Sequence, residues 1–252
     1  MDKYKDLFWQ LTIREIKARY KQSVLGFTWA VIVPLINLIV LSIVFSTFIR
    51  VPTDVPYSIF LFVGLIPWMF TANSISAATG SLLANSTLIT KVKLPREILP
   101  ISAISSKTID LFLTSLVLAI FLFVFGVKIK LVILLLPLIL LVHLLLIIGV
   151  SFILSATNVF FRDVENILGV FLTMWMYLTP ILYPIDLVPE QFRILLLLNP
   201  MTGIIMAYRD VILYGNIPSL LQFGYSTIFS IFIFISGYTY FKDRSKYFAD
   251  VI

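Results

Sequence analysis

The charged residues with the clearest scope for chemistry lie in one short segment between two long apolar stretches, NSTLITKVKLPREILPIS. Its charged residues are Lys91, Lys93, Arg96 and Glu97. Leu88, Val92 and Leu94 have helix-like spacing, so a short amphipathic helix here would present the charges to water. Such a helix suits the docking of a partner protein, and a solvated loop is the alternative. Charge alone does not decide between them.

Aromatic residues form the second group, and they make up 15% of the chain. The notable positions are Trp29, Trp68, Trp175, Tyr177 and Tyr183. An aromatic ring binds the C–H face of a sugar weakly, so a series of rings would suit a sliding polymer. The alternative is an aromatic belt at the membrane surface, where Trp and Tyr are common.

Several other chemistries have no residues to support them. The chain has no cysteine and a single histidine, which excludes thiolate catalysis and a histidine metal cluster. It contains no GxxxxGK[ST] phosphate loop and no paired carboxylates within its apolar stretches. We therefore expect no catalytic site, no metal and no cofactor on this chain.

Two isolated ionisable residues, Asp110 and His143, are predicted to have structural roles. Asp110 is interpreted as a charge at a helix end, paired with Lys107 or facing water. His143 lies in the middle of an apolar stretch, where it would hydrogen-bond a neighbouring helix. A proton relay is the alternative for His143.

Six apolar stretches must position these residues. The chain is 60% hydrophobic and 13% charged, about half the charge of a soluble domain. The stretches are Thr28–Ile49, Tyr57–Ala78, Thr108–Val127, Leu131–Thr157, Ile167–Tyr183 and Ser219–Phe241. Each is about long enough to cross a hydrocarbon core of roughly 30 Å. The sequence therefore predicts an all-α integral membrane protein, with a single transmembrane domain over residues 1–252.

Basic residues gather on one side of these spans. Residues 1–27, 79–107, 158–166 and 242–252 carry 14 of the 19 Lys and Arg residues. The positive-inside rule makes this side cytoplasmic, together with both termini. The positions of the charges thus explain the net charge of +6 by topology and not by nucleic-acid binding.

The apolar segment Leu187–Tyr208, within an outer region 184–216, is predicted to be a re-entrant helical hairpin. Asn199 and Pro200 interrupt it, and each half is too short to cross the membrane. Backbone of this kind is tolerated at membrane depth where protein buries it or where it lines a cavity. An amphipathic outer loop is the alternative. The two halves are Phe192–Leu198 and Met201–Tyr208.

Residues 1–27 predict an amphipathic helix that lies in the membrane interface. At 100° per residue, a basic face lies between two apolar stripes. One stripe is Tyr4, Leu7, Phe8, Leu11 and Ala18, and the other is Trp9, Ile13, Ile16 and Tyr20. We expect either a membrane anchor or a part in transport, with one stripe free to contact lipid and the other protein.

Four segments together resemble the permease subunits of type-2 ABC exporters of O-antigen, capsular polysaccharide or teichoic acid. They are IREIKARYKQSVLGFTWAVIVPL (13–35), KVKLPREILPIS (91–102), FFRDVENILGVFLTMWMYLTPILYP (160–184) and LNPMTGIIMAYRDVILYG (198–215). They follow the family's order along essentially the whole chain.

This resemblance implies a homodimer that works with two copies of a separate ABC ATP-binding subunit, which would hold ATP and magnesium. It implies export of a lipid-linked polysaccharide, O-antigen or similar, across the bacterial inner membrane. The alternatives are a teichoic acid exporter, a small lipid or drug exporter and, from a different class, an ion-coupled transporter or channel.

The resemblance also implies roles for particular residues. It places the coupling helix that contacts the ATPase on Lys91–Leu99, with Arg96 and Glu97 as its central pair. Asn199 and Pro200 would form the turn of an outer gate. The polymer path through the dimer interface would be lined by Trp29, Trp68, Phe70, Phe171, Trp175 and Tyr177.

Overall fold

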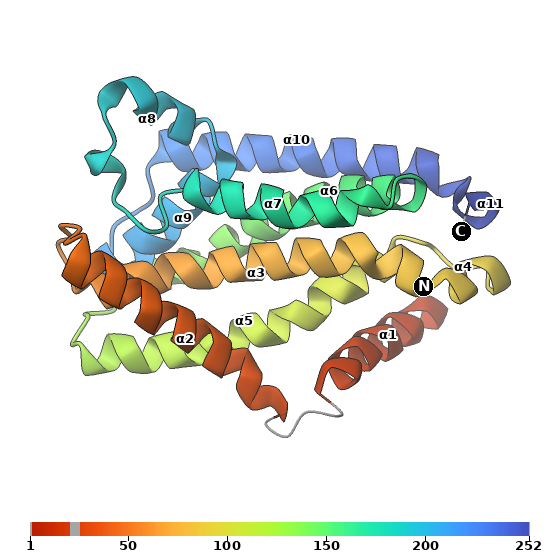
Figure 1. The fold of residues 1–252 in the computed structure, drawn as a ribbon, viewed down its shortest axis with the longest axis horizontal. Helices are drawn as coiled ribbons and strands as arrows, with labels where there is room; N and C mark the ends of the chain where they lie inside the picture. Colours follow the sequence, from red (N-terminus) through yellow and green to blue (C-terminus); the bar gives the residue numbers. More distant parts are fainter. Residues whose placement is uncertain (1, 21–25, 252) are drawn as a thin grey trace.

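The long helices of the chain form a bundle. The computed structural model describes residues 2–20 and 26–251, and every regular element in that part of the chain is helical. Five helical stretches are long and apolar enough to cross a membrane, and they lie along one long axis with α2 tilted across it (Figure 1). They are α2 (Trp29–Ser42) with its π-helical continuation Ile43–Phe48, α3 (Tyr57–Ala84), α5 (Ile98–Val124), α6 (Leu136–Phe160) with the preceding turn Leu131–Leu135, and α10 (Leu220–Ser245). The predicted all-α membrane fold is confirmed.

Both ends of the described chain lie at the same end of the bundle (Figure 1). This terminal end holds α1 (Asp2–Tyr20), α4 (Ser86–Lys91) and α11 (Phe248–Val251). The opposite, distal end holds α8 (Glu190–Leu197) and the connection between α2 and α3. The prediction that both termini share one side agrees with this arrangement.

Helix α7 (Asp163–Tyr177) is shorter than the span predicted over Ile167–Tyr183. Its 15 residues extend about 22 Å at 1.5 Å per residue, which is less than the hydrocarbon core. The chain continues as turns from 178 to 184. The prediction of helix as far as Tyr183 is therefore wrong, because Pro180 lacks an amide hydrogen and disfavours helical backbone at the residue before it.

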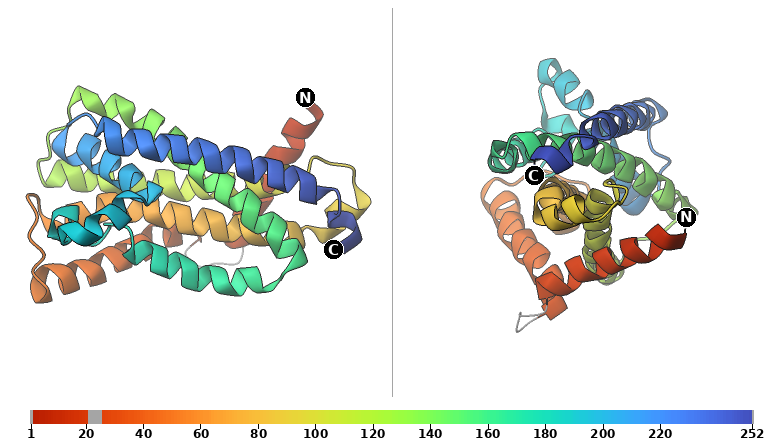
Figure 2. Two further views of the ribbon diagram at one scale, coloured as in Figure 1. Left: turned by 90° about the horizontal axis from the view of Figure 1, so that it is seen from above. Right: turned by 90° about the vertical axis from the view of Figure 1, so that its right-hand side faces the viewer.

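Helix α3 forms the centre of the bundle, and most of its side chains are buried. α5 and α6 pack against it, and α10 packs along α6 (Figure 2). α2 and α7 flank α3 on the same side and expose apolar residues such as Ile36, Ile39, Val170 and Met174. Lipid or another protein must cover these two helices.

Helices α6 and α10 approach each other closely through two glycines. A Cβ atom on Gly237 would collide with the carbonyl oxygen of Gly149. Small residues permit such approach, which matters where lipid removes the hydrophobic drive for helices to associate. This contact fixes α10 along the length of α6.

The connection between α3 and α5 differs from the predicted loop 79–107. Both long helices extend into that range, which leaves α4 and a non-helical segment at 92–97. The predicted coupling helix over Lys91–Leu99 is therefore wrong in position, since the short helix lies upstream. Pro95 gives the physical reason, because it disfavours helical backbone at Leu94 and cannot donate the helical hydrogen bond.

The region between α7 and α10 contains two short helices, as predicted. α8 and α9 (Pro200–Arg209) meet at an angle of 94°, counting the π-helical extension of α9 to Tyr214. The two are not equivalent. α9 is almost entirely buried, with Met201 and Ile204 inaccessible, whereas Leu196 is the buried residue of α8.

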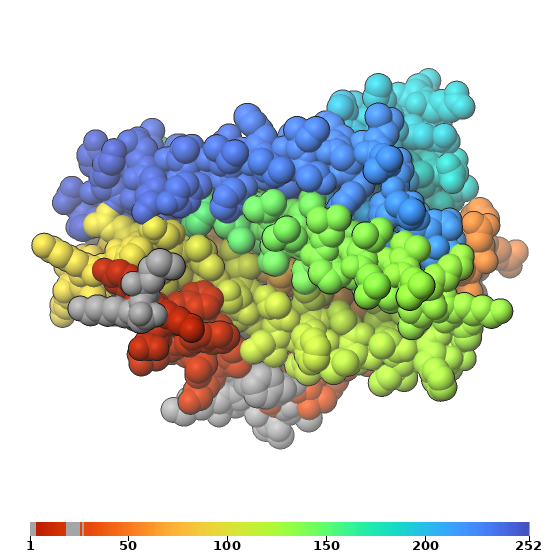
Figure 3. Space-filling view, turned by 180° about the vertical axis from the view of Figure 1, so that it is seen from behind, coloured from red at the N-terminus to blue at the C-terminus, as the bar shows by residue number. Residues whose placement is uncertain are grey.

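Helix α1 lies outside the bundle and packs against α5 (Figure 3). Leu11 is buried and Leu7 packs beside it in a cluster with residues of α3, α5 and α6. Trp9 and Ile13 are exposed. The first predicted stripe therefore contacts protein through Leu7 and Leu11, whereas Trp9 and Ile13 of the second stripe face away from it. Residues 21–25 of the predicted interface segment lie outside the described residues.

Candidate functional site

A groove of about 690 Å³ opens at the terminal end, between α1, the α4–α5 connection, α10 and α11. Its charged lining residues are Lys91, Lys93, Arg96, Glu97, Lys242 and Lys246. Lys91 and Lys93 are exposed. Since cations outnumber the single carboxylate of this lining, the groove attracts acidic groups. The four residues that the resemblance assigns to coupling are thus brought together.

The predicted central pair of that group is engaged within the chain. Lys242 Nζ of α10 donates to Glu97 Oε1 at 2.6 Å. The guanidinium of Arg96 lies 5.8 Å from the ring centre of Phe248 in α11. These contacts connect the α4–α5 segment to α10 and α11. Lys242 and Phe248 were not singled out by the sequence, because their partners lie far away along the chain.

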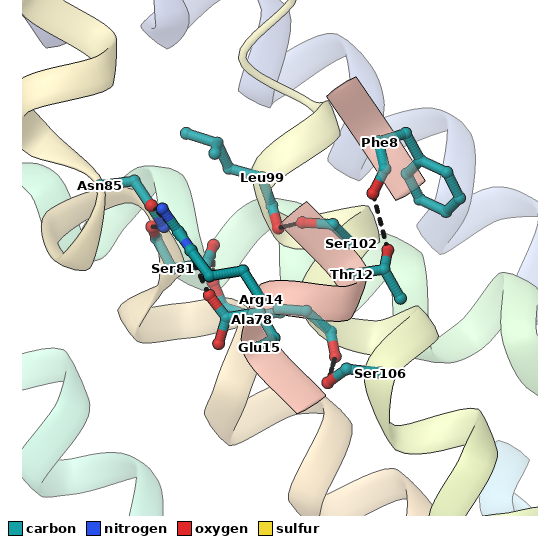
Figure 4. Close-up of polar contacts among 11 residues, drawn as sticks. Phe8, Thr12, Arg14, Glu15, Ala78, Ser81, Asn85, Leu99, Ser102 and Ser106 are labelled. Carbon is teal, nitrogen blue, oxygen red and sulfur yellow. Dashed lines mark hydrogen bonds and ion pairs between the residues drawn. The ribbon is translucent and has the colours of Figure 1, made fainter. Parts of the chain in front are cut away.

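The α3–α4 junction is also connected to α1, as Figure 4 shows. Arg14 of α1 donates a hydrogen bond to Oδ1 of Asn85. Asn85 is buried between the two helices, and its Nδ2 donates to the carbonyl oxygen of Ser81 at 2.8 Å. Thus α1 contacts the point at which α3 gives way to α4.

At the distal end, Asn199 organises a second polar cluster. Trp175 Nε1 donates to Asn199 Oδ1 at 3.0 Å, and the amide N–H of Met201 donates to the same oxygen at 3.0 Å. Asn199 Nδ2 donates to the carbonyl oxygen of Leu178 at 3.1 Å and to Thr179 Oγ1 at 2.9 Å. Asn199 therefore caps the N-terminus of α9 and holds the end of α7 at the same time.

Four predicted path residues lie around this cluster. The Trp68 and Trp175 rings meet edge to face with centroids 5.7 Å apart, and Phe171 lies 5.6 Å from Trp175. Trp68 is buried, whereas Phe171 is half exposed. Tyr177 is exposed at the end of α7, and its carbonyl oxygen accepts a hydrogen bond from the Tyr183 hydroxyl. The face of α7 thus presents aromatic rings beside the Asn199 turn.

The other two predicted path residues lie elsewhere. Trp29 and Phe70 line a cavity of about 320 Å³ between α2, α3 and α5. Lys107 and Asp110 line the same cavity. Asp110 lies about three turns inside α5, so its interpretation as a charge at a helix end is wrong. α5 begins at Ile98, well before Thr108, where the predicted third span begins.

The buried histidine forms the neighbour contact expected of it. His143 is inaccessible, and its Nε2 lies 2.7 Å from Thr71 Oγ1 of α3. The Tyr208 hydroxyl lies 3.5 Å from Nδ1, and the Phe70 ring packs edge to face on the imidazole. This interhelical contact accounts for His143 without a role in proton transfer.

Sequence reasoning missed the role of Arg209. It lies outside the predicted cytoplasmic segments and was given no role, yet its side chain is buried and contacts the segment that follows α7. The available signal was the run of apolar residues that precedes it in α9 and the apolar residues that follow Asp210. A cation inside an apolar helix needs a partner, and such residues are commonly functional.

Comparison with known proteins agrees with this architecture. The family model described as ABC-2 type transporter matches residues 6–213. The chain belongs to this family. It is 32% identical over 252 residues to the O-antigen export system permease protein RfbA of Klebsiella pneumoniae, covering 98% of this chain and 95% of the relative. It is 28% identical to the RfbA protein of Myxococcus xanthus, with 99% and 96% covered. It is 24% identical to the polysialic acid transport protein KpsM of Escherichia coli, with 94% and 92% covered.

Proposed function

We propose that this ABC-2 family chain is the membrane permease subunit of an exporter of lipid-linked polysaccharide, O-antigen or a similar polymer. The observation that carries the proposal is the match, over nearly the full length of both chains, to permeases named for O-antigen export. The match to a polysialic acid transport protein supports the broader class of polysaccharide. A teichoic acid remains the alternative polymer within this proposal.

ATP hydrolysis belongs, in this proposal, to two copies of a separate ATP-binding subunit, with ATP and magnesium held there. In the same proposal, the basic groove at the terminal end is the surface for that subunit, and this end faces the cytoplasm from the bacterial inner membrane. The placement is supported by the basic residues gathered there and by the contacts that tie the groove to α1 and α10.

The polymer path lies, in this proposal, between two copies of the chain. The exposed apolar faces of α2 and α7 flank α3 on one side and supply the surface for a second copy (Figure 2). α7 carries Phe171, Trp175 and Tyr177 on that side of the bundle, next to the Asn199 turn of the outer gate. Weak contacts with many rings let a polymer slide, whereas one tight site would retain it.

Disruption of the gene in a strain that makes a surface polysaccharide tests the function. We expect the lipid-linked polymer to accumulate inside the cell and to return to the surface when the gene is restored. A second copy that carries Arg96→Glu should restore export poorly, since it reverses the charge of the groove. Normal surface polymer in the disrupted strain would contradict the proposal.

A further inference from the structure

The guanidinium of Arg209 is buried at the distal end of the bundle. Arg209 is the last residue of α9, and it is 4% exposed. Nη1 donates to the carbonyl oxygen of Pro180 at 2.5 Å, and Nη2 donates to that of Ile181 at 2.6 Å. The carbon at the centre of the guanidinium stacks 3.6 Å from the ring centre of Phe60 on α3. One side chain therefore connects α9, α3 and the turn after α7.

A buried cation normally requires a carboxylate, because desolvation of a lone charge is costly. None of the ion pairs found among the described residues includes Arg209. Carbonyl dipoles and an aromatic face take that role here, as they do for intramembrane cations in general. The fold also makes room for the group, since a Cβ atom on Gly64 would lie 2.7 Å from Arg209 Nη2.

The turn that Arg209 holds has few other means of satisfying its carbonyl groups. Pro180 and Pro184 prevent regular helix there. The hydroxyl of Tyr57, on α3, donates to the carbonyl oxygen of Leu182 at 2.7 Å. Side chains of α9 and α3 thus bind three successive carbonyl groups, from 180 to 182. Backbone groups without partners are expensive within a membrane protein, so these donors determine where the turn can lie.

Two of the three nitrogens of the Arg209 guanidinium donate hydrogen bonds within the described part of the chain, and the third does not. Nε of Arg209 is buried without a hydrogen-bond partner among the described atoms. A buried donor of this kind costs free energy, which offsets part of the gain from the two short bonds. The net stabilisation by this side chain is therefore smaller than its two hydrogen bonds alone would give.

We propose that Arg209 is a positioning residue that clamps the 178–184 turn against α3 and α9, and that release of this clamp frees the outer end of α7 during transport. The clamp itself stands on the contacts above. Its release during transport rests on the proposed export function, because α7 carries the aromatic residues of the path.

Thiol labelling of the chain in membranes tests the clamp without a partner or a substrate. The natural chain has no cysteine, so a single introduced thiol is the only one that reacts. Leu182→Cys reports on the turn, because Leu182 is 2% exposed. Ile75→Cys, at an inaccessible position of α3, reports on loss of the fold, and Leu187→Cys is the exposed reference.

With Arg209 present, Leu182→Cys should react slowly with a membrane-impermeant maleimide. Arg209→Met, which fills similar volume without donors, should accelerate this reaction on the order of a hundredfold, since two charge-assisted hydrogen bonds are lost. Ile75→Cys should stay protected in the same background. Protection of Leu182→Cys despite Arg209→Met would overturn the clamp, and so would equal exposure of both buried positions, which signifies general unfolding.

A conservative variant separates the fork geometry from the charge. Arg209→Lys retains the charge but offers one ammonium group, which cannot match the planar fork and its stacking on Phe60. Its Leu182→Cys labelling should lie between those of the natural protein and Arg209→Met. Labelling as slow as in the natural protein would overturn the requirement for a two-carbonyl contact.

The release during transport is tested separately in the complex with an ATP-binding subunit. Arg209→Met should retain ATP hydrolysis while polymer export falls several-fold, because the path is no longer opened in step with hydrolysis. Equal losses of hydrolysis and export would point to a structural role and overturn the release. Absence of any export by the natural chain would refute the proposed function and leave the labelling result intact.

Discussion

Replacement of Asn199 by alanine is expected to destabilise the turn between α8 and α9 more than any other single change there. The side chain makes four hydrogen bonds, with Trp175, Met201, Leu178 and Thr179. Each contributes about 0.5–1.5 kcal/mol in soluble proteins and about 0.6 kcal/mol on average between membrane helices. The loss should therefore be about 2–4 kcal/mol, because the partners are left inside a partly buried cluster.

Thermal unfolding in detergent measures this loss. For a chain of this size, about 1 kcal/mol corresponds to about 2–4 °C, so Asn199→Ala should lower the midpoint by about 5–15 °C. Asn199→Asp keeps the oxygen that accepts from Trp175 and Met201, and it should lose less. Asn216→Ala, at an exposed position, is the matched control. A midpoint for Asn199→Ala that equals the control would refute the role given to this turn.

Three further predictions concern the groove, α1 and the aromatic residues predicted to line the polymer path. Glu97→Lys should weaken recovery of the ATP-binding subunit in pull-down, and adding Lys242→Glu should restore it, although the exposed pair changes stability by less than about 1 kcal/mol. Arg14→Ala should increase proteolysis of α1, since loss of a charged hydrogen bond costs about 1.5–3 kcal/mol. Trp68→Ala or Trp175→Ala should reduce polymer export at least about twofold, whereas Trp175→Phe should retain most of it because the ring remains.

Each of these predictions has an outcome that opposes it. If Glu97→Lys combined with Lys242→Glu does not restore recovery of the ATP-binding subunit, the ion pair has no part in binding that subunit. Proteolysis of Arg14→Ala no faster than that of Lys17→Ala, an exposed cation on the same helix, would remove the anchoring role. Normal export by both tryptophan-to-alanine variants would favour an aromatic belt, for which Trp9→Ala on the exposed face of α1 is the comparison.

The long helices were predictable because their apolar length exceeds what water-facing segments tolerate. Tyr57 begins both the predicted second span and α3. The predicted break at Asn199 and Pro200 also matches, since a proline at the first helical position and an asparagine before it are strong local signals. The start of α3 and the break before α9 are decided by residues adjacent in the sequence, and they can therefore be predicted from it.

The errors arise where prolines or tertiary contacts decide the outcome. Because Pro95 disfavours helix, the short helix α4 ends at the start of the predicted segment Lys91–Leu99. Because of Pro180, α7 ends before Tyr183, the predicted end of the span. The roles of Arg209 and Lys242 depend on partners that are distant in sequence, at Pro180 and Glu97. Assigning each charged residue to one side of the membrane does not show which residue it contacts.

Transport by purified protein tests the central proposal most directly. The chain and its ATP-binding subunit would be reconstituted into vesicles with lipid-linked polysaccharide, and a polymer-degrading enzyme would be confined to one side. We predict that ATP moves the polymer across the bilayer, and that it does so only when both subunits are present. Polymer that stays on its original side despite ATP hydrolysis by the assembled complex would contradict the account.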